Sequence, residues 1–111
     1  MTSSPRSYRV EWAIVAQRDL QTIIETIAVD DPLVAAKVLH QIESRAVALN
    51  RMPGRGRVLP ELAAMGIHTY RELIISPWRL VYRISETAVY VLAVFDGRRN
   101  MEDILLERLL R

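Results

Sequence analysis

Hydrophobic and polar positions change period along the chain, and each period predicts a different element. Residues 7–12 alternate apolar and charged side chains, as a half-buried strand does. In residues 13–29 and 32–49 apolar residues recur every three or four positions, which indicates two amphipathic helices. Between them, Asp31 is suited to be an N-cap and Pro32 to be the first helical residue. A connection this short predicts an antiparallel helical hairpin.

The second half of the chain is rich in β-branched and aromatic residues and is divided by proline and glycine. Residues 67–75, 78–84 and 89–95 therefore predict three consecutive strands of an antiparallel meander. A glycine- and proline-rich segment with several arginines, residues 51–60, predicts the main loop, and a short turn follows it. Asn100 is suited to cap a last helix, which has an apolar stripe.

The order of elements is thus strand, two helices, three strands and a short helix. The hairpin has to bury its apolar stripe, and the meander offers the only broad apolar surface. We therefore expect one α+β domain over residues 1–111, with the hairpin on one face of a mainly antiparallel four-stranded sheet. Alternation puts Trp78 and Tyr82 on the hairpin face and Arg79 and Arg83 on the other. The face that carries the arginines is expected to be open and functional.

Composition narrows the possible classes of protein. Of 111 residues, 50% are hydrophobic and 25% are charged, as in an ordinary folded domain. No apolar stretch approaches the roughly 20 residues of a membrane span, and the first residues do not resemble a secretory signal, so we expect a cytoplasmic protein. The chain has no cysteine, which excludes disulfides. His40, Glu43 and His68 are only a weak indication of a metal site, because two histidines lack a third firm ligand. Neither a metal nor a cofactor is expected.

The net charge of +2 is distributed unevenly. Residues 13–50 carry three basic and five acidic residues, whereas residues 51–111 carry ten arginines and seven acidic residues. Arginine suits bidentate binding of carboxylates and phosphates, so a partner with such groups is expected. A solvated arginine-rich surface is the alternative. No helix carries a dense basic stripe, which makes direct nucleic-acid binding a secondary prospect.

Three segments of the meander carry a resemblance to a known family: YREL (70–73), WRLVYR (78–83) and VFDGRR (94–99). In this order, and in a chain of this length, they closely resemble the RelE/ParE superfamily of toxins from bacterial type II toxin–antitoxin systems. The resemblance also covers the early strand, the hairpin and the loop. Two activities occur in that superfamily, since RelE-like members are ribosome-dependent mRNA endonucleases and ParE-like members inhibit DNA gyrase.

The match to the RelE-like nuclease site is incomplete. By resemblance Arg71, Arg79 and Arg99 match basic positions of that site, but Leu73 stands in place of a lysine and Leu105 in place of a tyrosine. Arginine, with a pKa above about 12, does not readily relay a proton at neutral pH. The remaining candidates for proton transfer are His68, Tyr70, Tyr82 and Tyr90.

The resemblance therefore favours a ParE-like toxin that inhibits DNA gyrase without hydrolytic chemistry. It implies a ParD-type antitoxin, which binds through apolar anchors and acidic residues in a toxin–antitoxin hetero-oligomer. A RelE-like mRNA endonuclease and a non-toxic interaction domain of the same fold are the alternatives. The expected target contacts are Arg71, Arg79, Arg83, Arg98 and Arg99. The expected antitoxin contacts are Trp78, Arg79, Arg83, Met101, Ile104, Leu105 and Leu109, although the last helix is favoured to dock on the fold.

Overall fold

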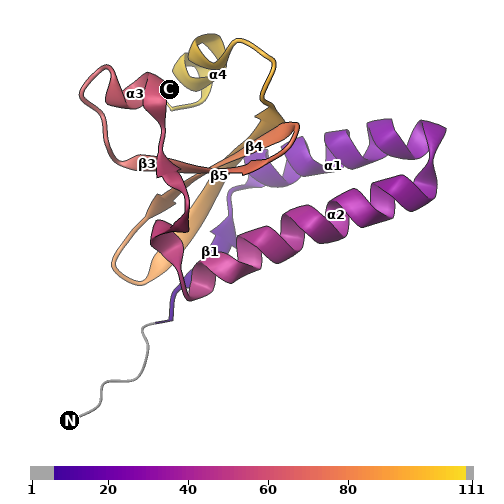
Figure 1. Ribbon diagram of the computed structural model, residues 1–111, viewed down its shortest axis with the longest axis horizontal. Coiled ribbons are helices and arrows are strands. Elements are labelled where there is room, and N and C mark those ends of the chain that lie inside the picture. The colour runs from indigo at the N-terminus through magenta and orange to yellow at the C-terminus, as the bar shows by residue number, and fades with distance from the viewer. Residues whose placement is uncertain (1–6, 110–111) are drawn as a thin grey trace.

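A computed structural model describes residues 7–109, apart from the side chains of Met101, Leu105, Leu106 and Leu109. Figure 1 shows a sheet with the long hairpin on one side and two short helices on the other. The elements in chain order are β1 (Arg9–Trp12), α1 (Ile14–Asp30), α2 (Pro32–Val47), the 3-10 turns η1 (Ala48–Asn50) and η2 (Pro53–Arg55), β2 (Arg57–Val58), α3 (Pro60–Ala63), β3 (Tyr70–Ile75), β4 (Trp78–Ile84), β5 (Ala88–Asp96) and α4 (Met101–Leu109).

The strands form one sheet in the order β1-β5-β4-β3-β2. The meander β3-β4-β5 is antiparallel as predicted, β2 pairs antiparallel with β3, and β1 pairs parallel with β5. The predicted α+β class is confirmed, but the sheet has five strands and not four. The additional strand β2 has only two residues, within the segment predicted as a loop, and two residues are too few to show an alternating pattern.

The helical hairpin covers one face of the sheet, as its apolar stripes predicted. The side chain of Asp31 accepts hydrogen bonds from the backbone N–H groups of Leu33 and Val34, and Pro32 is the first residue of α2. This cap fixes the turn between the two antiparallel helices. The main core lies between the hairpin and the sheet and includes Ala16, Leu20, Ile42, Ala46, Leu49, Leu73, Ile75, Leu80, Tyr82, Val89, Val91 and Val94.

The opposite face of the sheet is also covered, at its centre, by α3 and α4 (Figure 1). The expectation of an open arginine-bearing face is therefore wrong for this region. Leu62 from α3 and Ile104 from α4 supply the apolar groups that bury the middle of that face. The second core cluster consists of Leu59, Leu62, Val81, Ala93, Phe95 and Ile104. Within residues 7–109, no helix combines the length and the hydrophobicity needed to cross a bilayer.

Candidate functional site

Arg79 lies on β4, on the face covered by α3, and is paired with two carboxylates. Its Nη1 and Nη2 atoms donate to the two oxygens of Glu61, at 2.8 and 3.0 Å, and its Nε donates to Glu72. Glu72 also accepts a hydrogen bond of 2.7 Å from Nε of Arg57. The side chain of Arg79 is 12% exposed and that of Glu72 is 0% exposed. These four residues form a partly buried set of ion pairs, here named the Arg79 network.

The electrostatics of the Arg79 network favour the charged forms of Arg79 and Glu61. Burial disfavours the charge of Arg79, but the hydrogen bonds with Glu61 and Glu72 outweigh burial, so the pKa of Arg79 is raised. The hydrogen bond from Arg79 is in turn the main cause that lowers the pKa of Glu61. Nε, Nη1 and Nη2 of Arg79 each donate to a carboxylate, so the charge of Arg79 is neutralised within the fold and is less available to an external phosphate.

Arg83 lies on the same face and has a different environment. Its guanidinium carbon is 5.1 Å from the ring centroid of Tyr90, a cation–π distance. Tyr70 on β3 pairs with Arg83 on β4, and Arg83 pairs with Tyr90 on β5. Tyr90 in turn pairs with Glu11 on β1, so these four residues form a row across the sheet. No carboxylate in the described part of the chain forms a salt bridge with Arg83. Its charge is therefore available to a partner.

Trp78 and Arg99 lie together at the end of the sheet next to α1. They line a hollow of about 380 Å³ that also includes Thr22, Thr26 and Asp96. Among residues 7–109, Arg99 has no salt-bridge partner and is exposed. The structure thus joins one expected antitoxin contact and one expected target contact in a single concave surface.

Arg98 is a neighbour of this hollow and is paired locally. Its Nη2 and Nε atoms donate to the carboxylate of Asp96, at 2.5 and 2.9 Å. The hydrogen bond from Arg98 lowers the pKa of Asp96 to about 2. The side chain of Arg98 is 80% exposed, and ion pairs at such exposure hold a side chain only weakly, so Arg98 is free to exchange partners.

Arg71 does not belong to the same surface as Arg79. On β3 it is paired with Tyr82, and both lie on the face of the hairpin, opposite Glu72 and Arg79. Its Nη1 donates a hydrogen bond of 2.7 Å to the backbone carbonyl of Gly56. The three arginines that the resemblance places in one site, Arg71, Arg79 and Arg99, therefore lie in three different surroundings.

The last helix docks on the fold, as favoured from the sequence. Ile104 is buried with Val81 and Phe95, and Arg108 donates two hydrogen bonds to Asp19 on α1, at 3.0 and 2.5 Å. Asp19 also accepts a hydrogen bond of 3.1 Å from the backbone N–H of Val94. One carboxylate thus links α1, β5 and α4. The side chains of Met101, Leu105 and Leu109 lie outside the described part of the structure.

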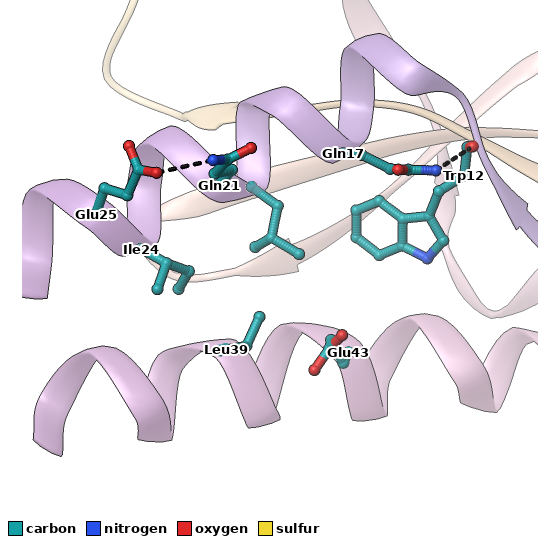
Figure 2. Close-up of a pocket in the computed structure, with 8 residues that line it drawn as sticks. Trp12, Gln17, Gln21, Ile24, Glu25, Leu39 and Glu43 are labelled. Carbon is teal, nitrogen blue, oxygen red and sulfur yellow. Dashed lines mark hydrogen bonds between the residues drawn. The ribbon is translucent and has the colours of Figure 1, made fainter. Parts of the chain in front are cut away.

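Sequence reasoning missed a second hollow, of about 550 Å³, between α1 and α2. Figure 2 shows Ile24 of α1 and Leu39 of α2 pointing into the space between the helices, with Trp12 farther along it, next to Gln17. The apolar stripes of both helices were visible in the sequence, but periodicity does not tell how much of a stripe the sheet covers. The polar residues that line this groove are Gln17, Gln21, Glu25 and Glu43.

The groups considered for proton transfer are not hydrogen-bonded to the arginines, and Tyr90 meets Arg83 through its ring. The hydroxyl of Tyr82 is bonded to Gly56 and Pro53 on the hairpin side, and burial raises its pKa. No hydrogen bond joins His68, Tyr70, Tyr82 or Tyr90 to an arginine within residues 7–109. Within the described residues 7–109, no group of three or more acidic or histidine side chains could hold a metal ion.

Comparison with known proteins identifies the family. The family model described as the ParE toxin of the type II toxin–antitoxin system parDE matches residues 10–101. The chain belongs to the ParE toxin family. It is thus a toxin component of the type II toxin–antitoxin class, in the ParE/RelE superfamily.

Two curated relatives are similar in sequence to this chain and support its membership of the ParE family. Toxin ParE3 of Caulobacter vibrioides is 34% identical over 68 residues, which cover 61% of this chain and 64% of that protein, slightly under two thirds of its length. The putative toxin Y4kP of Sinorhizobium fredii is 32% identical over 99 residues, covering 87% of this chain and 96% of that protein. The second match extends the similarity over nearly the whole chain.

Solved structures share the fold of this ParE-family chain. The chromosomal ParDE system of P. aeruginosa contains a chain with a TM-score of 0.68 and 19% identity, covering 82% of this chain and 97% of that one. The RelBE2 toxin–antitoxin complex of Mycobacterium tuberculosis gives a TM-score of 0.56 and 26% identity over 86% of this chain and 97% of that one. A free E. coli RelE mutant gives a TM-score of 0.60 at 16% identity, over 95% of this chain and 97% of that one.

Proposed function

We propose that this ParE-family toxin inhibits DNA gyrase, stalls it with cleaved DNA and so blocks replication. The observation that carries the proposal is the match of residues 10–101 to the toxin of parDE systems. The toxin acts in the cytoplasm, where its target and its antitoxin are made. Its antitoxin is of the ParD type and forms a hetero-oligomer with it.

The proposed inhibition requires no hydrolytic chemistry, and the environment of Arg79 supports this view. Cleavage of RNA by its own 2′-hydroxyl needs free cations around the phosphate and a group that takes and gives a proton near neutral pH. Arg79 is held by Glu61 and Glu72, and no tyrosine or histidine among the considered candidates is bonded to a described arginine. In the described part of the chain, the free cation Arg83 lies against the ring of Tyr90, but no hydrogen bond joins it to a group that could relay a proton.

Target binding is proposed for Arg83, Arg98 and Arg99. Among the five arginines expected to contact the target, these three have accessible charges. Arg83 stacks on Tyr90 without a carboxylate partner, Arg98 has only an exposed ion pair, and Arg99 borders the hollow beside Trp78. Arg71 and Arg79 have backbone or carboxylate partners that fix them within the fold. Their part in toxicity is proposed to be indirect, through the shape of the sheet.

Antitoxin binding is proposed at the hollow lined by Trp78 and Arg99. An acidic segment with apolar anchors would place a carboxylate on Arg99 and an apolar side chain against the indole. Ile104 is buried beneath α4, so it becomes a contact only where the antitoxin displaces that helix. Arg79 is covered by α3, so it becomes a contact only where the antitoxin displaces α3.

The direct test compares two reactions with the purified toxin. We expect it to abolish supercoiling by DNA gyrase and to leave mRNA on translating ribosomes uncut. Arg83→Ala and Arg99→Ala are expected to weaken inhibition of gyrase, whereas Arg18→Ala, an exposed arginine on α1, serves as the matched control. Toxin that cuts mRNA on ribosomes without affecting supercoiling would establish the RelE-like alternative, which the likeness to the RelBE2 complex keeps in view.

The antitoxin proposal is tested in cells. Induction of the toxin should arrest growth, and co-expression of the product of the neighbouring upstream gene should restore it. A short upstream reading frame encoding a ribbon-helix-helix protein is expected. Normal growth after induction of folded protein would instead indicate a non-toxic interaction domain.

A further inference from the structure

The chain has two oppositely charged regions that follow each other in sequence. Residues 13–44 contain two basic and five acidic residues, whereas residues 45–60 contain four arginines and no acidic residue. The first region forms the helical hairpin, and the second leads from the end of α2 through η1 and η2 into the edge strand β2. Within the second region, residues 51–58 are named the arginine loop. Such a separation of charge gives the molecule a positive end that attracts polyanions.

The arginine loop is held against the sheet by buried polar groups. The hydroxyl of Tyr82 donates to the carbonyl of Pro53 at 2.6 Å and accepts from the N–H of Gly56 at 2.9 Å. Arg71 donates to the carbonyl of Gly56 at 2.7 Å. A Cβ atom at position 56 would collide with the backbone oxygen of Glu72 and the Tyr82 hydroxyl, so only glycine allows this close approach. The loop is therefore pre-organised, which lowers the entropic cost of binding a partner.

Two of the three arginines of the arginine loop, Arg51 and Arg55, are not neutralised by an acidic residue of the described chain. Arg51 and Arg55 are exposed and have no salt bridge to any described residue, and the side chain of Arg57 is 59% exposed although its Nε binds Glu72. Glu72, which binds Arg57, is also engaged by Arg79, as is Glu61. The loop consequently presents guanidinium groups that retain free donors.

We propose that the arginine loop binds the phosphodiester backbone of nucleic acid, with Arg51 and Arg55 as the main contacts. Guanidinium groups bind phosphate oxygens through paired N–H donors, and such contacts need charge and donors alone. A protein partner would in addition need an apolar centre for its interface, whereas both hollows described above lie outside the loop. The proposal goes beyond inhibition of gyrase and does not depend on it.

The test measures binding of the purified full chain to a fluorescently labelled 30-base-pair DNA duplex over a range of salt concentrations. Each lost phosphate contact should reduce the salt slope by about 1, so the R51A/R55A double variant should lower it by about 2 and weaken binding about tenfold at moderate salt. The R9A/R18A double variant removes the same formal charge from β1 and α1 and should bind like the parent chain. The loop is held by backbone atoms of residues 53 and 56, so R51A/R55A should retain its melting temperature.

A single-stranded RNA of equal length and a glutamate-rich peptide complete the design. Binding of either DNA or RNA that is weakened by R51A/R55A, and not by R9A/R18A, supports the proposal. The polymer that binds more tightly shows whether the loop prefers DNA or RNA. Equal weakening by R51A/R55A and R9A/R18A would overturn it, because net charge alone would then explain the binding. Binding of the peptide but of neither nucleic acid would also overturn it and assign the loop to an acidic protein segment. The assay contains no gyrase, so its outcome is independent of the proposed function.

Discussion

Arg79 on β4 and Glu61 on α3 are joined by two parallel hydrogen bonds, of 2.8 and 3.0 Å, on the sheet face opposite the hairpin. Helix α3 has only four residues, too few to be stable without tertiary contacts. The paired hydrogen bonds and Leu62 attach it to the sheet. Arg79 is therefore a structural residue of this toxin, and loss of toxicity on its replacement does not by itself identify a binding site.

Replacement of Arg79 by alanine is expected to lower the free energy of unfolding by about 3 kcal/mol, because it leaves the fully buried carboxylate of Glu72 with Arg57 alone. Urea denaturation followed by circular dichroism measures the change. Arg83→Ala is the matched control on the same strand face and should cost less than about 1 kcal/mol, since that side chain loses only its contact with Tyr90. Equal stability of the two variants would contradict a structural role for Arg79.

The bond between Arg79 and Glu61 also predicts how stability changes with pH. The pKa of Glu61 is lowered in the folded protein, mainly by the hydrogen bond from Arg79, so the folded state favours the carboxylate more than the unfolded state does. The stabilisation is present above the ordinary glutamate range, about 4.3, and is lost as the pH falls through the lower folded value.

Glu61→Gln should therefore be less stable than the parent chain at pH 7, and the difference should shrink below about pH 4. Thermal melts of both proteins from pH 7 to pH 3 provide the measurement. Glu43→Gln, which replaces an exposed carboxylate without a described salt bridge, is the control and should be as stable as the parent chain at pH 7. A constant difference between parent and Glu61→Gln at all pH values would refute the assigned interaction.

The elements with long periodic patterns could be predicted from the sequence, and the contacts between distant residues could not. The hairpin follows from its apolar stripes and from Asp31 with Pro32, and the meander follows from its β-branched runs. Alternation also placed Tyr82 and Arg79 on opposite faces correctly. It did not indicate that α3 would cover the arginine face, because this helix has four residues, too few to show a period. The apolar stripe of α4 favoured docking on the fold but did not identify the sheet face that the helix covers.

The candidate site illustrates the same limit. Arg71, Arg79 and Arg99 occupy matching positions of a family pattern, but pattern gives no information on which carboxylates each arginine meets. Glu61 precedes Arg79 by 18 positions and Glu72 precedes it by 7, so neither pairing has a local signal. Resemblance nevertheless identified the superfamily correctly, since it relies on several segments in order.

The hydroxyl of Tyr82 is expected to stabilise the arginine loop. Tyr82→Phe leaves the N–H of Gly56 and the carbonyl of Pro53 without their buried partner, which should lower the free energy of unfolding by about 1–3 kcal/mol. Amide hydrogen exchange should accelerate at Gly56 more than in β4 and β5. Tyr90→Phe, which loses a hydroxyl without a described hydrogen bond, is the control. Unchanged exchange at Gly56 would show that the loop is held by other contacts.

Asp19 is expected to control the docking of α4, because it binds both Arg108 and the backbone N–H of Val94. Arg108→Ala removes only the link to α4, whereas Asp19→Ala also leaves the Val94 N–H without its partner. Amide exchange in residues 101–109 should therefore rise in both variants, and exchange at Val94 should rise in Asp19→Ala alone. The free energy of unfolding should fall by about 1 kcal/mol for Arg108→Ala and by more for Asp19→Ala. If both variants keep the parent's exchange in α4, Ile104 and the second core cluster hold the helix by themselves, and the ion pair has no part in its release.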